Sequence, residues 1–92
     1  MRPFAEISDD IELKAALAAR INELISLRGL SQCEAAFEVG TTQPKISQIR
    51  RYKLVNISVG RLLQALVALG QRIDIVISPA EQKTLPAVRV AA

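Results

Sequence analysis

The sequence contains no histidine and no tryptophan, and its one cysteine is Cys33. Without histidine, Ser-His-Asp and Cys-His catalytic arrangements cannot form, and most zinc sites lose a usual ligand. A single cysteine excludes both an intrachain disulfide and a thiolate metal cluster. Because no Gly-rich phosphate loop occurs and the carboxylates are scattered, we expect no enzyme activity, no metal and no other cofactor.

Two interpretations of Cys33 follow from its place near the start of a predicted helix. A helix N-terminus can lower the pKa of a thiol, which would suit a redox sensor. However, no second cysteine is present to resolve an oxidised form within the chain. We therefore prefer a small, partly buried filler.

Long hydrophobic runs are also absent. No segment is long enough to cross a bilayer, and residues 1–6 lack the apolar stretch of a secretory signal. These two features predict a cytoplasmic, reducing location.

Size and composition indicate one small helical domain. The chain has 92 residues, half of them hydrophobic, and only three aromatic side chains, Phe4, Phe37 and Tyr52. Such a chain builds a modest core, so a second subunit would add stability. We predict an N-terminal arm over 1–8, a DNA-binding domain with a dimerisation strand over 9–78, and a flexible tail over 79–92.

Carboxylates are missing from residues 41–72, which carry six basic side chains. Residues 1–40 have a net charge of −3 and residues 73–92 are neutral, so this one segment gives the chain its net charge of +3. An acid-free basic segment is a candidate face for a polyanion. The alternative is an ordinary solvated surface.

Four helices are predicted from hydrophobic spacing and capping residues. The first runs from Asp9 to about Leu27 and ends before Gly29. Ser31 and Glu34 form the capping box of the second, which ends at Gly40. Thr42 caps the third, whose first turn holds Pro44, and Ser58 caps the fourth, which ends at Gly70.

The expected inward-facing residues follow from the same periodicity. The direction of Phe37 is left open. The inward residues of the four helices, in chain order, are Leu13, Leu17, Ile21, Leu24, Ala35, Ala36, Val39, Ile46, Ile49, Val59, Leu62, Leu63, Leu66 and Leu69.

The hydrophobic period changes from helix to strand after Gly70. Ile73, Ile75 and Ile77 alternate with other residues, and Pro79 ends the pattern. A lone strand leaves its backbone groups unpaired. The candidate partner within the chain is residues 87–90, but the same strand of a second subunit is the better one, because two copies pair symmetrically.

The two short helices joined at Gly40 have the spacing of a helix-turn-helix motif. With Ile46 and Ile49 inward, helical rotation points Pro44, Ser47, Gln48 and Arg51 away from the core. Gln43 and Lys45 flank that face, and Arg50 lies towards one edge. Gln, Ser and Arg side chains form hydrogen bonds with base edges. Tyr52 either stacks on sugar-phosphate or packs against the fourth helix, and we prefer packing.

The stretch from Leu30 to Ile49 resembles the Cro/cI-type, or xenobiotic-response-element (XRE), helix-turn-helix family. The order of elements over 11–78 is similar to HigA-type antitoxins and their stand-alone relatives. This resemblance implies an all-α, lambda-repressor-like bundle of four to five helices with one short C-terminal β-strand. It also implies a homodimer on a palindromic operator and a RelE-like toxin as partner.

The resemblance assigns roles to individual residues. Gln32 and Lys53 would meet phosphates, and Arg51 would reach a base or a phosphate. The sequence departs from the family at 51–54, where the family often has a Gly-Lys or Asn-Gly turn. The side chains that would face bases or adjacent phosphates are Thr42, Gln43, Ser47 and Gln48.

Together these features predict a sequence-specific DNA-binding transcriptional regulator that acts as an autorepressing antitoxin. The predicted DNA-contacting set also includes Lys45 and Arg50, on the flanks of the reading face. Two alternatives stay open: a stand-alone repressor, and a helix-turn-helix used only as a protein-interaction scaffold. The tail over 79–92 either folds onto a partner or is a plain terminus.

Overall fold

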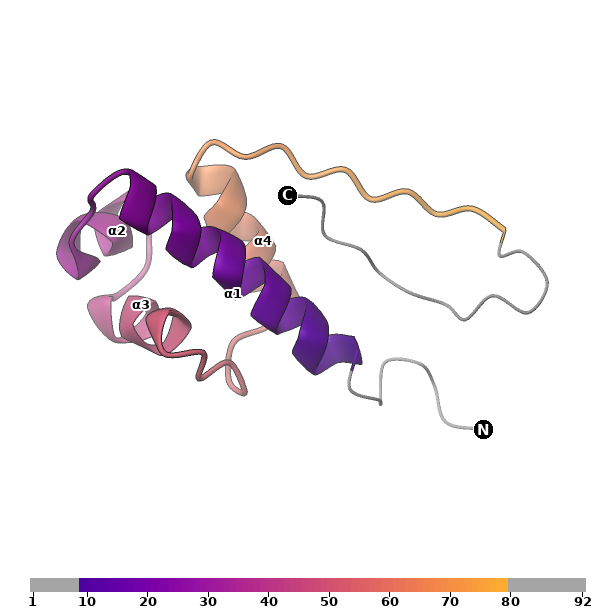
Figure 1. Ribbon diagram of the computed structural model, residues 1–92, viewed down its shortest axis with the longest axis horizontal. Helices are drawn as coiled ribbons and strands as arrows, with labels where there is room; N and C mark the ends of the chain where they lie inside the picture. The colour runs from indigo at the N-terminus through magenta and orange to yellow at the C-terminus, as the bar shows by residue number, and fades with distance from the viewer. Residues whose placement is uncertain (1–8, 80–92) are drawn as a thin grey trace.

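The computed structural model describes residues 9–79 and places four helices in that range (Figure 1). None of the four is long and apolar enough to pass through a membrane. The all-α helix-turn-helix part of the prediction is confirmed. The predicted arm over 1–8, and the predicted tail from residue 80 onward, lie outside the described residues. The helices are α1 Asp9–Leu27, α2 Gln32–Val39, α3 Gln43–Arg50 and α4 Val59–Ala68.

Short polar side chains begin three of the helices, as the sequence predicted. The hydroxyl oxygens of Ser31, Thr42 and Ser58 accept hydrogen bonds from the backbone nitrogen three residues further on, at 3.0, 3.3 and 3.1 Å respectively. Each bond satisfies one N–H group that has no partner within its helix. The starts of α2, α3 and α4 are therefore fixed by local sequence.

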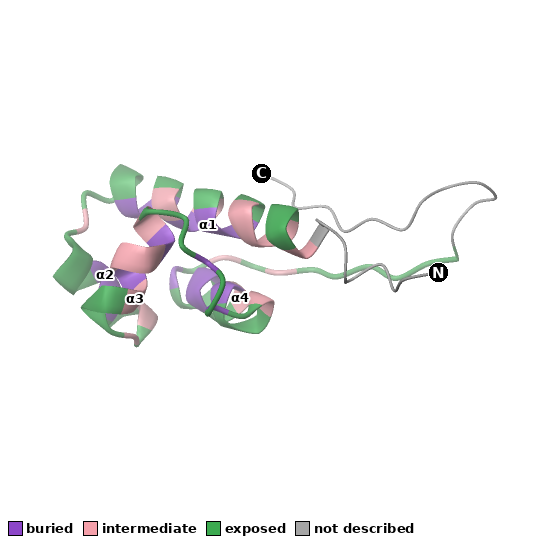
Figure 2. Ribbon diagram, turned by 90° about the horizontal axis from the view of Figure 1, so that it is seen from below, coloured by how far each residue is buried: buried purple, intermediate pink, exposed green. Residues whose placement is uncertain are grey.

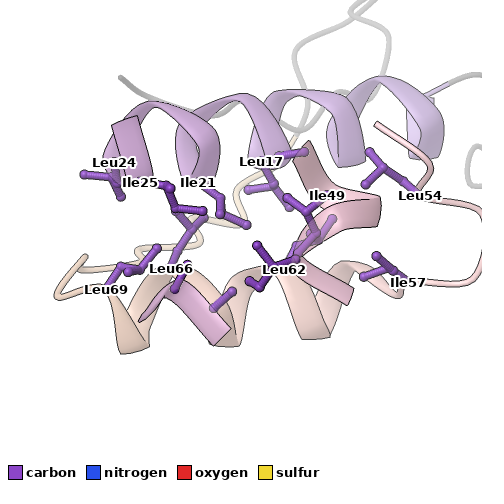
Figure 3. Close-up of a cluster of buried hydrophobic side chains, with 14 of the residues drawn as sticks. Leu17, Ile21, Leu24, Ile25, Ile49, Leu54, Ile57, Leu62, Leu66 and Leu69 are labelled. Atoms are coloured by element: carbon purple, nitrogen blue, oxygen red, sulfur yellow. The ribbon is translucent and has the colours of Figure 1, made fainter. Parts of the chain in front are cut away.

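The core lies where α1 crosses α4, with α2 and α3 packed beside this pair (Figures 1 and 2). The buried stripe of α1 meets that of α4, and Ile21 and Leu62 are fully buried (Figure 3). Leu54 and Ile57 are also buried. Their burial has no signal in the sequence, because two isolated apolar residues have no helical or strand period.

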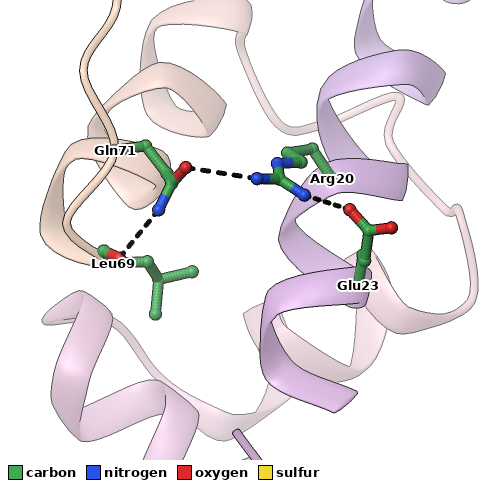
Figure 4. Close-up of polar contacts among 4 residues, drawn as sticks. All are labelled: Arg20, Glu23, Leu69 and Gln71. Carbon is green, nitrogen blue, oxygen red and sulfur yellow. Dashed lines mark hydrogen bonds and ion pairs between the residues drawn. The ribbon is translucent and has the colours of Figure 1, made fainter. Parts of the chain in front are cut away.

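Polar side chains connect the C-terminal half of α1 and the residue after it to the end of α4. Arg28 donates to the backbone oxygen of Leu69. Arg20 pairs with Glu23 and lies 3.5 Å from the Gln71 side-chain oxygen, while the Gln71 amide nitrogen donates to Leu69 at 3.3 Å (Figure 4). Arg28 and Gln71 thus satisfy the carbonyl of Leu69, which α4 itself leaves unpaired.

Two side chains of α2 point to solvent. Cys33 is exposed, so its interpretation as a partly buried filler is wrong. Phe37, whose direction the sequence left open, is 88% exposed. The exposure of both side chains follows from the packing of α2, since Ala35 and Ala36 occupy the face of this helix that packs inward.

Residues 71–79 form an extended segment that leads away from the helices (Figures 1 and 2). No strand is assigned between residues 9 and 79. Ile73 packs against the core, whereas Ile75, Val76 and Ile77 are 71%, 86% and 92% exposed. The predicted strand and its pairing across a dimer are not confirmed and stay predictions.

Candidate nucleic-acid interface

The turn between α2 and α3 is closed by backbone hydrogen bonds at Gly40. The backbone nitrogens of Gly40 and Thr41 both donate to the carbonyl of Ala36 at 2.9 Å. Gly40 has a φ of 78°, a left-handed conformation that glycine adopts without strain. Ala36 is buried where the two helices meet. Small residues at these positions let the two helices of the motif approach closely.

The N-terminal end of α2 carries the predicted capping box. The Ser31 backbone nitrogen donates to the Glu34 carboxylate at 2.9 Å, and the Glu34 nitrogen donates back to the Ser31 hydroxyl at 3.0 Å. The bond from the Ser31 backbone, with a further contribution from its side chain, lowers the pKa of the Glu34 carboxyl. Gln32, the first residue of α2, is exposed beside this box.

The exposed side of α3 brings together most of the predicted reading residues. Gln43, Pro44 and Arg51 are exposed, and Ser47 between them is half-buried. Thr42 is exposed at the start of the helix, where its side chain accepts a hydrogen bond from Lys45 N. This face therefore presents an amide, a hydroxyl and a guanidinium to solvent.

Gln48 is less accessible than helical rotation predicted. The residue is half-buried, and its Oε1 atom is buried without a hydrogen-bond partner among the described residues. The backbone oxygen of Gln48 accepts a hydrogen bond from the backbone nitrogen of Lys53 at 2.8 Å, which closes the C-terminal turn of α3. Periodicity gives the direction of a Cα–Cβ bond, but it does not give the burial of the atoms at the end of a long side chain.

Two predicted cations contact other parts of the molecule: Arg50 contacts α1, and Lys45 borders a cavity beside α4. Arg50 reaches α1, where its guanidinium donates to the Asn22 backbone oxygen at 3.0 Å. Lys45 lines a small cavity of about 80 Å³ beside the α2–α3 turn, together with Arg61 and Gln64 of α4. Lys53, by contrast, is exposed beyond the end of α3.

The end of α3 uses a tyrosine where the other three helices use glycine. Gly29, Gly40 and Gly70 end their helices with positive φ, and Tyr52 follows α3 with a φ of 57°. A left-handed conformation is costly for a residue with a Cβ atom. Tyr52 is half-exposed and borders an open hollow beside α1, lined also by Ala19, Asn22, Glu23, Ser26 and Arg50. Packing of Tyr52 against the fourth helix, the preferred sequence interpretation, is therefore replaced by a position beside α1.

Within residues 9–79, the charges around α3 have no carboxylate partners. In the range 9–79, the ion pairs are Lys14–Asp10, Arg20–Glu23 and Arg72–Asp74. None of them involves the basic side chains between Thr41 and Gln71. The positive charge predicted from the acid-free segment is thus not neutralised by a carboxylate of the described residues. Those side chains are Lys45, Arg50, Arg51, Lys53 and Arg61.

The sequence did not predict the residues of α1 that contact α3 and the segment after it. Asn22 of α1 donates to the backbone oxygen of Ile49 at 3.0 Å, and Ser26 lies 3.4 Å from the Arg50 guanidinium. Lys14 donates to the backbone oxygen of Leu54 at 3.3 Å. Single polar residues on an amphipathic helix carry no pattern, so no sequence signal could have identified them.

Comparison with known proteins agrees with the fold and the site. Residues 5–78 match a family model described as a helix-turn-helix domain. A solved structure of an XRE family transcriptional regulator is 37% identical, with a TM-score of 0.87 over 92% of this chain and 97% of the other. No curated protein matches the chain.

The fold and its exposed third helix define a helix-turn-helix protein. The match over residues 5–78 and the identity to the solved regulator place the chain in a particular group. It belongs to the XRE family of helix-turn-helix proteins.

The capping box predicts a pH dependence of stability that Glu34→Gln should remove. The pKa of Glu34 is lower in the folded protein than the ordinary carboxyl value of about 4.5, so the unfolded chain binds more protons between the two values. The stabilisation is fully present above the ordinary value and is lost as the pH falls through the folded value.

Thermal melts from about pH 6 to about pH 3 measure this effect. The melting temperature of the wild type should exceed that of Glu34→Gln, and this difference should shrink as the pH falls. The glutamine in this variant keeps an acceptor for the Ser31 nitrogen. A constant difference between the two proteins across that range would contradict the assignment.

Proposed function

We propose that the protein is a sequence-specific DNA-binding transcriptional regulator whose α3 enters the major groove. The observation that carries this proposal is the exposed face of a capped α3, flanked by cations that have no carboxylate partner within residues 9–79. Gln43 and Ser47 offer groups that bond to base edges. Gln32, Arg51 and Lys53 surround them as phosphate contacts, which supply affinity and orientation. The proposal includes a cytoplasmic location, where such a regulator meets DNA.

The similarity to the solved regulator supports this proposal. That protein is named as an XRE family transcriptional regulator and matches almost the whole of both chains. Gln43, Pro44 and Arg51 are exposed among residues 9–79, and this exposure supports groove binding by α3. A helix-turn-helix used only as a scaffold would not need exposed cations such as Arg51 and Lys53 at the end of α3.

The proposed regulator is a homodimer that pairs residues 73–77 of two copies as antiparallel strands. In a strand, Ile75 and Ile77 would lie on the same side as Ile73, and both are exposed in the single chain. A second copy would cover these side chains and satisfy the unpaired backbone groups. Such a dimer would place its two α3 helices about 34 Å apart on a palindromic operator.

A further part of the proposal is that this regulator represses its own operon as an antitoxin. The order of elements, which is similar to HigA-type antitoxins, supports a RelE-like toxin as partner. The test is co-expression with the product of an adjacent short basic reading frame. Rescue of growth together with a stable complex on size exclusion would support the role, and a neighbouring product that is harmless alone would contradict it.

Salt dependence tests the DNA-binding proposal. Fluorescence anisotropy on a duplex selected by the wild-type protein should show affinity falling steeply as salt rises, because bound cations release counterions from phosphates. Lys53→Gln should lower the log–log salt slope by about 0.9 per subunit and weaken binding to all duplexes alike.

Gln43→Ala and Arg72→Gln are the matched variants for that assay. Gln43→Ala should relax base preference more than it lowers total affinity, because it removes a base contact. Arg72→Gln removes a cation paired with Asp74, away from α3, and should leave the slope unchanged. Binding that does not respond to salt would refute the proposal.

Ile75→Pro tests the dimer. Proline removes a ladder donor from the middle of the proposed strand, so sedimentation should show monomers that bind DNA poorly. The control Val76→Thr keeps the strand-forming backbone and should remain dimeric. Because Ile75 is 71% exposed in the single chain, the helical content should not change. Dimers of unchanged stability in Ile75→Pro would show that the interface lies elsewhere.

A further inference from the structure

Two hydrogen bonds join the C-terminal end of α3 to the middle of α1, one in each direction. The Asn22 side-chain nitrogen donates to the backbone oxygen of Ile49 at 3.0 Å. The Arg50 guanidinium donates to the backbone oxygen of Asn22 at 3.0 Å and lies 3.4 Å from the Ser26 hydroxyl oxygen. Each helix thus gives a side-chain donor to a main-chain acceptor of the other. We call this set of contacts the α1–α3 clasp.

The clasp supplies a geometric constraint that apolar packing does not. Ile46 and Ile49 hold α3 by burial, which depends on area and has no preferred direction. A short helix held only in this way can roll or slide by small amounts on its neighbours. Hydrogen bonds weaken steeply as their angle departs from linear. Because the clasp acts on Ile49 and Arg50, the last two residues of α3, it fixes the roll and tilt of that helix against α1.

The side chain of Asn22 does not maximise the stability of the fold. Its Oδ1 atom is buried and has no hydrogen-bond partner among the described residues. A buried acceptor without a partner destabilises a fold. The Ile49 oxygen also accepts from the Tyr52 nitrogen at 3.1 Å, so it does not need Asn22 to be satisfied. A leucine would fill a similar space without the unpaired oxygen, so the benefit of asparagine lies in the direction of its bond.

We infer that Asn22 and Arg50 are positioning residues that set the pose of α3 in the DNA groove. This inference rests on the proposed function and gives Arg50 a role different from the direct DNA contact that the sequence predicted. Base recognition depends on the exact placement of Gln43 and Ser47, whereas phosphate affinity depends on the number of available cations. Loss of the clasp should therefore reduce discrimination between sequences and leave the salt dependence of binding unchanged.

The test compares the wild type with Asn22→Leu and Arg50→Met. Lys53→Gln is the matched control, because Lys53 is exposed close to the same end of α3 and is the proposed phosphate contact. Anisotropy is measured at several salt concentrations on two duplexes, one selected by the wild-type protein and one of the same composition in scrambled order. Circular dichroism melts establish that each variant is folded at the assay temperature.

Asn22→Leu and Arg50→Met should lower the ratio of the two affinities about tenfold, the discrimination that one base contact supplies. Their salt slopes should equal that of the wild type. Lys53→Gln should keep the ratio and lower the slope by about 0.9 per subunit. A residue that only stabilised the fold would change the melting temperature without changing the ratio. Asn22→Leu should melt close to the wild type, since it removes a hydrogen bond and an unpaired acceptor together.

Two results would overturn the inference. One is a salt slope that falls in Arg50→Met as it does in Lys53→Gln, which would make Arg50 a phosphate contact. The other is an unchanged affinity ratio in both clasp variants. If Arg50→Met does not fold, Arg50→Lys takes its place, because lysine keeps the charge without the planar donor fork. A wild-type protein that binds both duplexes equally would instead overturn the proposed function itself.

Discussion

The eight-residue helix α3 cannot hold its shape alone, and the reading face depends on its burial against the other helices. Isolated helices this short are unstable in water, because the first turn costs more entropy than its hydrogen bonds return. α3 offers only Ile46 and Ile49 to the core, and both are buried. The larger contact between α1 and α4 provides the surface that receives them. The reading face is therefore a product of tertiary packing.

The basic side chains of the acid-free segment are divided among three directions. Arg50 points to α1, Lys45 to the cavity beside α4, and Arg51 and Lys53 to solvent. A count of charge treats these side chains alike. A cation that is bonded within the protein, as Arg50 is, would have to break that bond to contact a phosphate. In our proposals Arg50 orients α3, whereas Arg51 and Lys53 would contact DNA.

Departures from ideal local structure gather at the C-terminal end of α3. Tyr52 adopts a left-handed conformation, and the side-chain oxygens of Asn22 and Gln48 are buried without hydrogen-bond partners among the described residues. Elsewhere the helix ends use glycine or a short polar cap, as local rules require. Proteins tend to break such rules at functional sites, where geometry matters more than stability. The position of these departures agrees with a role for this end of α3 in setting the reading pose.

The sequence by itself determined the four helices, their caps and most of their inward residues, because these depend on neighbours within one or two turns. Ser31, Thr42 and Ser58 act on the N–H group three residues away, and the leucine spacing of α4 is a local period. Tertiary structure alone decided the burial of Leu54 and Ile57, the inward turn of Arg50 and the burial of the Gln48 side-chain oxygen. Those outcomes depend on segments distant along the chain, and a long side chain has several rotamers of similar energy until a neighbouring helix selects one.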